Sequence, residues 1–335
     1  LNFGLIRKVI EYVKSTYSEQ KAMFNLTTNG VLLSDQIGDY LVDNDVAVSV
    51  SLDGPQEEHD RLRVFASGRG SFDKVYRNVR HLYERHSGYT AGMLLSCYDY
   101  GTDLCAVRQF FDEHEVGEFP YLARANFVKP HFSSYHDQYT GQDRQRLNGQ
   151  LAQLRESYYG KVTRQEGSPD MTQVGYLHAL VGADCRLVLL RRFSDKGRLP
   201  YLPYTGACVP GDKIAVDPDG TFHLCERITP SFPIGHVERG LDMDRIVAII
   251  NAYNEQMTTE CPTCPVTRMC GICFSVLGAD GSFAKDPPDI CQRVVERTRE
   301  QLSHTYSILE EKPDAYEDMV TDYHKRLAKT RVIDF

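Results

Sequence analysis

The chain has 335 residues, of which 41% are hydrophobic and 25% are charged, an ordinary composition for a globular protein of one large or two smaller domains. The formal net charge of −8 argues against nucleic acid or an anionic membrane surface as a partner. No apolar run approaches the ~20 residues that a membrane-spanning helix requires, so no membrane partner is predicted either.

The first 130 residues alternate between the patterns of helices and strands. Apolar residues recur at helical spacing in the helical segments, and continuous apolar or β-branched runs mark the strands. Helices are predicted over 3–17, 35–43, 72–86 and 103–115, with Ser34 and Ser71 as N-caps, and strands over 22–28, 46–52, 90–97 and 119–127. This alternation predicts an α/β fold with a parallel sheet, either a barrel or a doubly wound sheet.

Polar residues follow these predicted strands at the points where they end. The first strand runs into Asn29, and the second runs through Ser51 into Asp53. In parallel α/β folds the carboxyl ends of the strands form one edge, and the chemistry takes place there. We therefore expect functional side chains at this edge.

The amino-acid composition and the pattern of predicted elements change after residue 130. We predict linking and bridging helices over 131–199, a compact domain rich in Pro, Gly and Cys over 200–300, and a helical cover over 301–335. Residues 1–130 form the first predicted domain.

Cysteines dominate the third of these regions. The chain has ten cysteines, and seven of them lie between positions 208 and 291. Disulfide scaffolds are usually short secreted chains, whereas C-x2-C pairs in a large chain without a secretory signal favour metal binding. We therefore expect thiolate-bound metal in a reducing, cytoplasmic setting.

The spacing of the seven cysteines indicates two metal centres. A predicted hairpin over 214–225, with Asp219-Gly220 at its turn, brings Cys208 and Cys225 together. Seven thiolates exceed the capacity of one four-coordinate centre, and compact ferredoxin-like runs often exchange ligands between two clusters. On spacing alone, iron–sulfur is favoured and zinc remains open. The other five of these seven cysteines are Cys261, Cys264, Cys270, Cys273 and Cys291.

This arrangement resembles the SPASM domain, which carries auxiliary iron–sulfur clusters in radical S-adenosylmethionine (SAM) enzymes. The spacing departs from that pattern at one step, with two residues instead of three between Cys270 and Cys273. The resemblance implies two auxiliary [4Fe–4S] clusters, one held by Cys208, Cys225 and Cys273. The other would be held by Cys261, Cys264, Cys270 and Cys291. Either Cys185 completes the first cluster or one of its irons stays open.

The first part of the chain is similar to the later βα units of a radical SAM partial (β/α)6 barrel. The resemblance rests on NLTTNG (25–30), VSVSLDGP (48–55), HDRLR (59–63) and GSFDKVYRNV (70–79). It implies that Ser51 and Arg63 bind the SAM carboxylate, and that Asn29 and Asp53 face its amino acid or ribose. A zwitterionic ligand needs such a convergence of cation, hydroxyl and acceptors.

The family's C-x3-C-x2-C motif, which holds the cluster that cleaves SAM, does not occur in this sequence. It would lie in earlier βα units, which at ~30 residues each would add roughly 60 residues. The expectation is therefore an N-terminally incomplete enzyme, with a third cluster upstream.

The segments 206–228 and 232–240 look most like maturases of the sactipeptide and ranthipeptide type. This resemblance implies an enzyme that forms thioether crosslinks from cysteines of a ribosomally made, Cys-rich precursor peptide, with a flavodoxin or ferredoxin as reductant. No catalytic side chain is identified. One alternative is an anaerobic sulfatase-maturing, formylglycine-generating enzyme. A second is a non-catalytic zinc or iron–sulfur binding protein.

Overall fold

The computed structural model consists of two compact units. One unit takes Leu1–Ala183 and Glu311–Phe335, and the other takes Asp184–Glu310. The structure describes the ranges 2–19, 22–114, 122–128, 134–164, 175–190, 208–226, 232–257, 261–270, 272, 278–279, 282–283 and 288–330. None of the helices described is long and apolar enough to cross a membrane.

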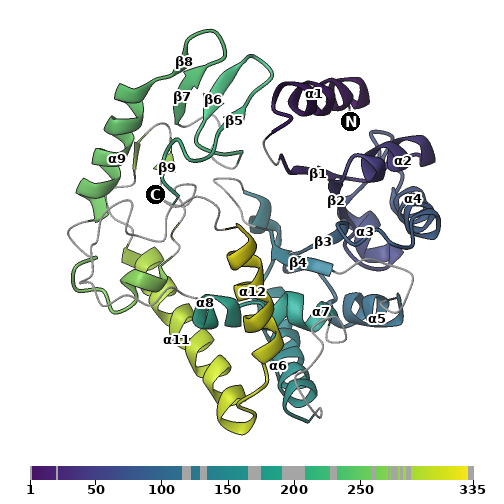
Figure 1. The fold of residues 1–335 in the computed structure, drawn as a ribbon. Coiled ribbons are helices and arrows are strands. Elements are labelled where there is room, and N and C mark those ends of the chain that lie inside the picture. The colour runs from purple at the N-terminus through teal and green to yellow at the C-terminus, as the bar shows by residue number, and fades with distance from the viewer. Residues whose placement is uncertain are drawn as a thin grey trace. The chain divides into compact units, whose positions relative to one another are not determined.

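The first unit is built on a four-stranded parallel sheet whose strands lie in chain order (Figure 1). The strands are β1 (Phe24–Thr28), β2 (Val46–Ser51), β3 (Met93–Tyr98) and β4 (Leu122–Phe127). In the register of β1 and β2, Thr28 pairs with Val50, so the residues that follow these strands emerge at the same edge. The predicted α/β fold with a parallel sheet is confirmed.

Helices connect the strands, as the alternating pattern predicts. They are α1 (Phe3–Thr16), α2 (Asp35–Asp43), α3 (Gln56–Leu62), α4 (Phe72–Arg85) and α5 (Leu104–His114). Their ends lie close to the predicted ones, except that α3 had no counterpart in the sequence pattern. α2 and α4 lie beside each other against the sheet, where Leu41, Val79 and Leu82 are buried (Figure 1). Val46, Val48 and Val50 of β2 are each at most 2% exposed, as expected for an inner parallel strand.

The two predicted N-caps have different outcomes. The Ser34 side chain accepts a hydrogen bond from the backbone of Ile37, so its role as a cap is confirmed. Ser71 makes no capping bond, and the prediction for it is wrong. Instead, Asp60 Oδ1 accepts a hydrogen bond from the backbone N–H of Phe72 at 2.8 Å, which leaves the Ser71 hydroxyl available for other partners.

The rest of the first unit is helical. It comprises η1 (Tyr135–Gln138), α6 (Gly141–Arg164), α7 (Gly175–Leu177), a short π-helix η2 (His178–Gly182) and α12 (Glu317–Thr330). A buried polar contact joins α6, η2 and Tyr316, the residue that precedes α12. Tyr158 lies 3.0 Å from His178 Nδ1 and donates to the Tyr316 hydroxyl at 3.4 Å.

The second unit contains small antiparallel sheets and helices. Its elements are α8 (Cys185–Leu189), β5 (Ala215–Val216), β6 (Thr221–His223), β7 (Pro233–His236), β8 (Gly240–Leu241), α9 (Met243–Met257), η3 (Thr267–Met269), β9 (Gly278–Ala279), β10 (Ser282–Phe283) and α11 (Pro288–Glu311). β5 and β6 pair antiparallel around Gly220, which adopts φ +89°, so the predicted hairpin is confirmed. The domain boundaries predicted at 131, 200 and 301 stay predictions.

Candidate functional site

An ion pair between Asp53 and Arg63 lies at the carboxyl edge of the parallel sheet. Asp53 directly follows β2 and is 4% exposed, and Arg63 follows the last residue of α3. Arg63 Nε donates to Asp53 Oδ2 at 2.5 Å and Nη2 donates to Oδ1 at 3.1 Å. The backbone N–H of Cys97 in β3 donates to the same Oδ1 at 2.9 Å. The carboxylate is therefore held from both the helix and the neighbouring strand.

This environment keeps the guanidinium of Arg63 charged. Burial acts to lower the pKa of Arg63, but the hydrogen bond to Asp53 and the negative charge of that carboxylate outweigh it and raise the pKa. The Arg63 side chain is 26% exposed. A fixed, partly accessible guanidinium suits a carboxylate or phosphate ligand.

The other two predicted SAM contacts lie at the ends of neighbouring strands. Ser51 is the half-buried last residue of β2, and Asn29 directly follows the paired strand β1. Asn29 is exposed, and its side chain accepts a hydrogen bond from the backbone of Val31 at 3.2 Å in a local turn. No contact between these two side chains and the Asp53–Arg63 pair occurs among the hydrogen bonds of the described residues, so their shared role stays a prediction.

A buried histidine supports the ion pair, although its position in the sequence suggests only a loop or capping residue. His59 of α3 is fully buried, with Nδ1 3.4 Å from the backbone N of Asp53 and Nε2 3.0 Å from Ser71 Oγ. Burial lowers the pKa of this imidazole. The signal was present in the sequence, because His59 and Arg63 are four residues apart and lie on one helix face.

A second buried carboxylate follows the next strand along. Asp99 comes directly after β3 and is inaccessible to solvent. Arg61 of α3 binds it in a bidentate pair, at 2.8 Å to Oδ1 and 3.0 Å to Oδ2. The hydroxyls of Tyr135 and Tyr139 donate to Oδ2 at 2.5 and 2.7 Å. No sequence signal pointed to Asp99, since its partners come from segments up to 40 residues away.

Aromatic side chains continue this edge beyond Asp99. The Tyr100 ring lies 5.0 Å from the rings of Phe127 and His136, and the guanidinium of Arg144 lies 4.3 Å above it. Tyr100 is therefore accounted for by packing and a cation–π contact. Tyr121, another aromatic residue of the strand predicted over 119–127, lies outside the described residues.

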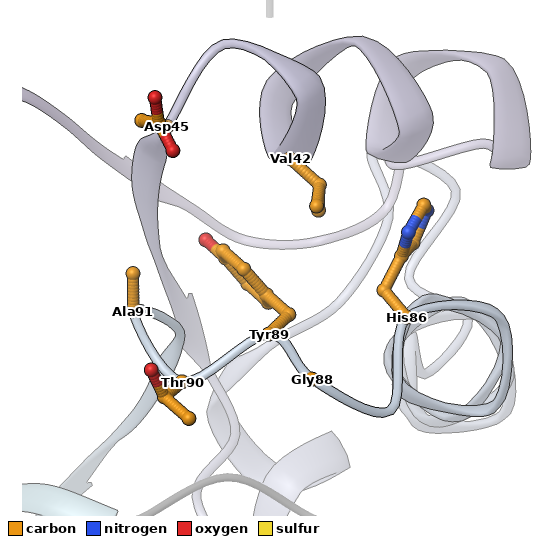
Figure 2. A pocket seen from close by; sticks show the side chains of 7 residues that line it. All are labelled: Val42, Asp45, His86, Gly88, Tyr89, Thr90 and Ala91. Atoms are coloured by element: carbon orange, nitrogen blue, oxygen red, sulfur yellow. The ribbon is translucent and has the colours of Figure 1, made fainter.

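A hollow of about 360 Å³ lies elsewhere, at the amino ends of β2 and β3 (Figure 2). Its lining residues are Val42, Asp45, His86, Gly88, Tyr89, Thr90 and Ala91. The Tyr89 hydroxyl is occupied by the backbone of β2, because it donates to Val46 O at 2.6 Å and accepts from Val48 N at 2.8 Å. None of the predicted site residues lines this hollow.

In the second unit, two of the predicted ligands act electrostatically on a third, Cys270. Burial raises the pKa of the Cys270 thiol, and the neighbouring sulfurs of Cys264 and Cys291 raise it further. The C-x2-C segment forms a turn in which Cys264 N donates to Cys261 O at 3.2 Å. The hydroxyl of buried Thr267 lies 2.6 and 2.9 Å from the carbonyls of Cys261 and Cys264 and stabilises this turn.

These cysteines pack against one apolar core. The core contains Leu224, Phe232, Ile234, Ile246, Ile249, Tyr253 and Ile272, and the half-buried cysteines on it are Cys225, Cys261, Cys270 and Cys291. A mostly apolar surround and several thiols fit a thiolate-bound cluster. Within the part of the chain that the structure describes, no group of three His, Cys, Asp or Glu has the geometry of a closed metal site. Cys208 is exposed, Cys185 is buried in α8, and Cys273 lies outside the described residues.

No protein-family model matches the chain. The chain is 31% identical over 77 residues to the cysteine-type anaerobic sulfatase-maturating enzyme of Clostridium novyi. The matched segment covers 23% of this chain and 21% of that enzyme. The chain is 37% identical over 81 residues to the serine-type anaerobic sulfatase-maturating enzyme of Bacteroides thetaiotaomicron, covering 24% and 19%. These matches span about a fifth of the length of each of the two curated relatives.

Solved structures match over much more of the chain. Native anSMEcpe with bound AdoMet and the Cp18Cys peptide has a TM-score of 0.59 at 17% identity, covering 91% of this chain and 82% of that one. Native anSMEcpe with bound AdoMet has a TM-score of 0.60 at 18% identity, covering 92% and 82%. A sequence identity this low supports a shared fold and nothing further. The chain therefore has the radical SAM/SPASM fold of the anaerobic sulfatase-maturating enzymes, which confirms the predicted fold class.

Proposed function

We propose that this protein is a radical SAM enzyme that modifies a peptide substrate. The observation that carries the proposal is the charged, partly accessible Arg63, fixed by Asp53 at the carboxyl edge of a parallel sheet. The fold adds support, because parallel α/β proteins bind ligands at this edge. When bound, SAM and a reduced iron–sulfur cluster would supply radical chemistry that abstracts hydrogen from a C–H bond.

The residues of the first unit would bind and orient the SAM molecule. The guanidinium of Arg63 would pair with the carboxylate of SAM. The hydroxyl of Ser51, the last residue of β2, would donate a further hydrogen bond to SAM. Asp53 would hold Arg63 in place, and Asn29 would approach from the neighbouring strand end. The Arg61–Asp99 pair would fix the next part of the edge through α3.

The cysteines of the second unit would hold the two auxiliary [4Fe–4S] clusters. Cys261, Cys264, Cys270 and Cys291 form the set proposed for one cluster, supported by the packing of Cys261, Cys270 and Cys291 against one apolar core. Cys208, Cys225 and Cys273 form the set proposed for the other, with Cys185 or an open iron at its fourth position. A flavodoxin or ferredoxin would supply electrons, and the proposed location is the cytoplasm.

Two alternative peptide modifications are compatible with this proposed function. Thioether crosslinking of a Cys-rich precursor peptide is supported by the sequence of segments 206–228 and 232–240. Formylglycine formation is supported by the names of the curated relatives, which are sulfatase-maturating enzymes, and it fits no worse. The product distinguishes the two. A thioether keeps the sulfur and loses two hydrogens per crosslink, whereas formylglycine made from cysteine loses the sulfur and reacts with a hydrazide probe.

Two binding measurements test the proposal without relying on turnover. After anaerobic reconstitution, Cys270→Ser should reduce bound iron and acid-labile sulfide, whereas Cys105→Ser, on α5 of the other unit, should not. Arg63→Met should abolish SAM binding measured by calorimetry, and Arg80→Met, whose side chain pairs with Glu84 on the exposed face of α4, should leave it unchanged. Zinc without acid-labile sulfide, or a chain that does not bind SAM, would contradict the proposal.

A further inference from the structure

We propose that His59 and Ser71 are positioning residues that set the Asp53–Arg63 pair for SAM, and that they do so only while His59 is neutral. This inference rests on the proposed function. It concerns two residues that lie behind the ion pair and cannot reach a ligand themselves, because His59 is fully buried and Ser71 is 6% exposed.

Three hydrogen bonds link these residues to both members of the pair. The backbone N–H of Asp53 donates to His59 Nδ1 at 3.4 Å. His59 Nε2 lies 3.0 Å from Ser71 Oγ, and the Ser71 hydroxyl donates to the backbone carbonyl of Arg63 at 2.9 Å. One end of the chain of bonds therefore holds Asp53, and the other holds Arg63.

A single arrangement of protons satisfies all three bonds. Since Nδ1 accepts from Asp53, it carries no proton, and a neutral imidazole then has its proton on Nε2. That proton is donated to Ser71 Oγ, which leaves the Ser71 proton free for the Arg63 carbonyl. A protonated imidazole would place an N–H of His59 against the N–H of Asp53, and the first bond would be lost.

Neighbouring contacts hold this chain of hydrogen bonds, from Asp53 through His59 and Ser71 to Arg63, in place. The backbone N–H of Ser71 donates to the Arg63 carbonyl at 3.2 Å, and that of Arg63 donates to the His59 carbonyl at 2.9 Å. The ring of His59 meets the ring of Phe72 edge-on at 5.8 Å. A displacement of the imidazole would therefore move the backbone on both sides of the ion pair, and a misplaced guanidinium binds a carboxylate less well.

Burial, and not the charged groups around it, favours the neutral form of His59. The carboxylates of Asp53 and Asp60 favour protonation, whereas the guanidinium of Arg63 opposes it. The residues that α4 presents to the ring, Ser71 and Phe72, carry no charge. Burial is the largest influence and lowers the pKa of His59 below its ordinary value of 6.5. Affinity for SAM should therefore fall as the pH is lowered through this depressed pKa, below 6.5.

The test is the affinity of the whole chain for SAM, measured by calorimetry between pH 5 and 8. Ser71→Ala removes one hydroxyl with little change in volume and should weaken binding at pH 7.5 about ten-fold, the loss of one or two hydrogen bonds. His59→Gln lacks an acceptor at the Nδ1 position and should weaken it at least as much. His59→Asn, which can keep that acceptor, should recover part of the affinity and lose the pH dependence.

His86→Gln is the matched control, because His86 pairs with Asp39 and lines the hollow at the opposite edge of the sheet (Figure 2). Thermal melts at pH 7.5 show whether each variant is folded. Unchanged affinity in folded Ser71→Ala and His59→Asn, with a flat wild-type pH profile, would overturn the inference while leaving the proposed function intact. A wild-type chain that binds no SAM would overturn both.

Discussion

Asp99→Asn tests the buried carboxylate that ties α3 to the end of β3. Both oxygens of Asp99 accept hydrogen bonds, from Arg61, Tyr135 and Tyr139, and from the backbone of Gly101 at 2.9 Å. An amide of the same shape removes the charge and turns one acceptor into a donor. Whichever way the amide lies, its NH2 group then faces an N–H of Arg61, because Arg61 donates to both oxygens.

The magnitude follows from the burial of the pair. Breaking a buried ion pair costs roughly 3–5 kcal/mol, because it leaves one charge without its partner. The Arg61 side chain is 29% exposed, so water compensates part of that loss. We therefore expect Asp99→Asn to lower the free energy of unfolding at pH 7 by about 3 kcal/mol.

The loss should depend on pH in a defined direction. Burial alone would raise the pKa of Asp99, but the hydrogen bonds from Arg61, Tyr135 and Tyr139 outweigh it and hold the pKa well below its usual range. The unfolded chain therefore binds this proton at a higher pH than the folded chain does. The stabilisation is present above about pH 5, begins to fall near the unfolded value of about 4, and is lost fully only as the pH falls through the depressed folded pKa.

Urea denaturation measures this effect, followed by circular dichroism and by tyrosine emission, since the chain has 20 tyrosines and no tryptophan. Asp39→Asn is the control, because Asp39 makes a comparable pair with Arg85 at the surface and should change the midpoint little. A double-mutant cycle with Arg61→Met isolates the pair. A loss below about 1 kcal/mol, or one that persists unchanged at pH 3.5, would refute the reasoning.

Three further predictions concern the packing of each unit and the buried histidine. Gly30→Ala should destabilise the first unit by about 1–3 kcal/mol, because Gly30 adopts φ +75° and a Cβ there would lie 2.8 Å from Val50 Cγ1; a neutral result in denaturation would contradict it. Ile234→Ala should cost the second unit about 2–5 kcal/mol, since Ile234 is inaccessible to solvent, and an unchanged melting curve would argue against this core. Because burial lowers the pKa of His59, the unfolded state binds that proton first, so the wild type should lose stability as the pH falls below 6.5, and His59→Asn should show a weaker slope.

Much of the fold was predictable because it depends on local patterns. The helix predicted over 35–43 coincides with α2, and Ser34 caps it as expected. The strand predicted over 46–52 matches β2 to within one residue. Asp219-Gly220 predicted the hairpin of β5 and β6 in the same way, since a turn residue with positive φ is visible in the sequence. Apolar periodicity and turn chemistry require only neighbours along the chain.

The site was predictable in part. Its position at the carboxyl edge follows from parallel strand order, and the chain indeed brings Asp53 and Arg63 together there. Ser71 was wrongly predicted to cap α4 with its side chain, because a serine that caps a helix and a serine that bonds to another segment look the same in sequence. Only the position of Asp60, which caps α4 in place of Ser71, separates them.

The sequence alone was enough to predict the alternation of strands and helices, the parallel sheet and the grouping of the cysteines along the chain, whereas the strand order came from the structure. The tertiary structure alone decided which polar groups are buried together. Asp99 has no local signature, and its role exists only because α3, η1 and the end of β3 converge on one carboxylate. The physical reason is that burial makes such groups costly unless they are paired, and the partners are supplied by segments distant in the chain.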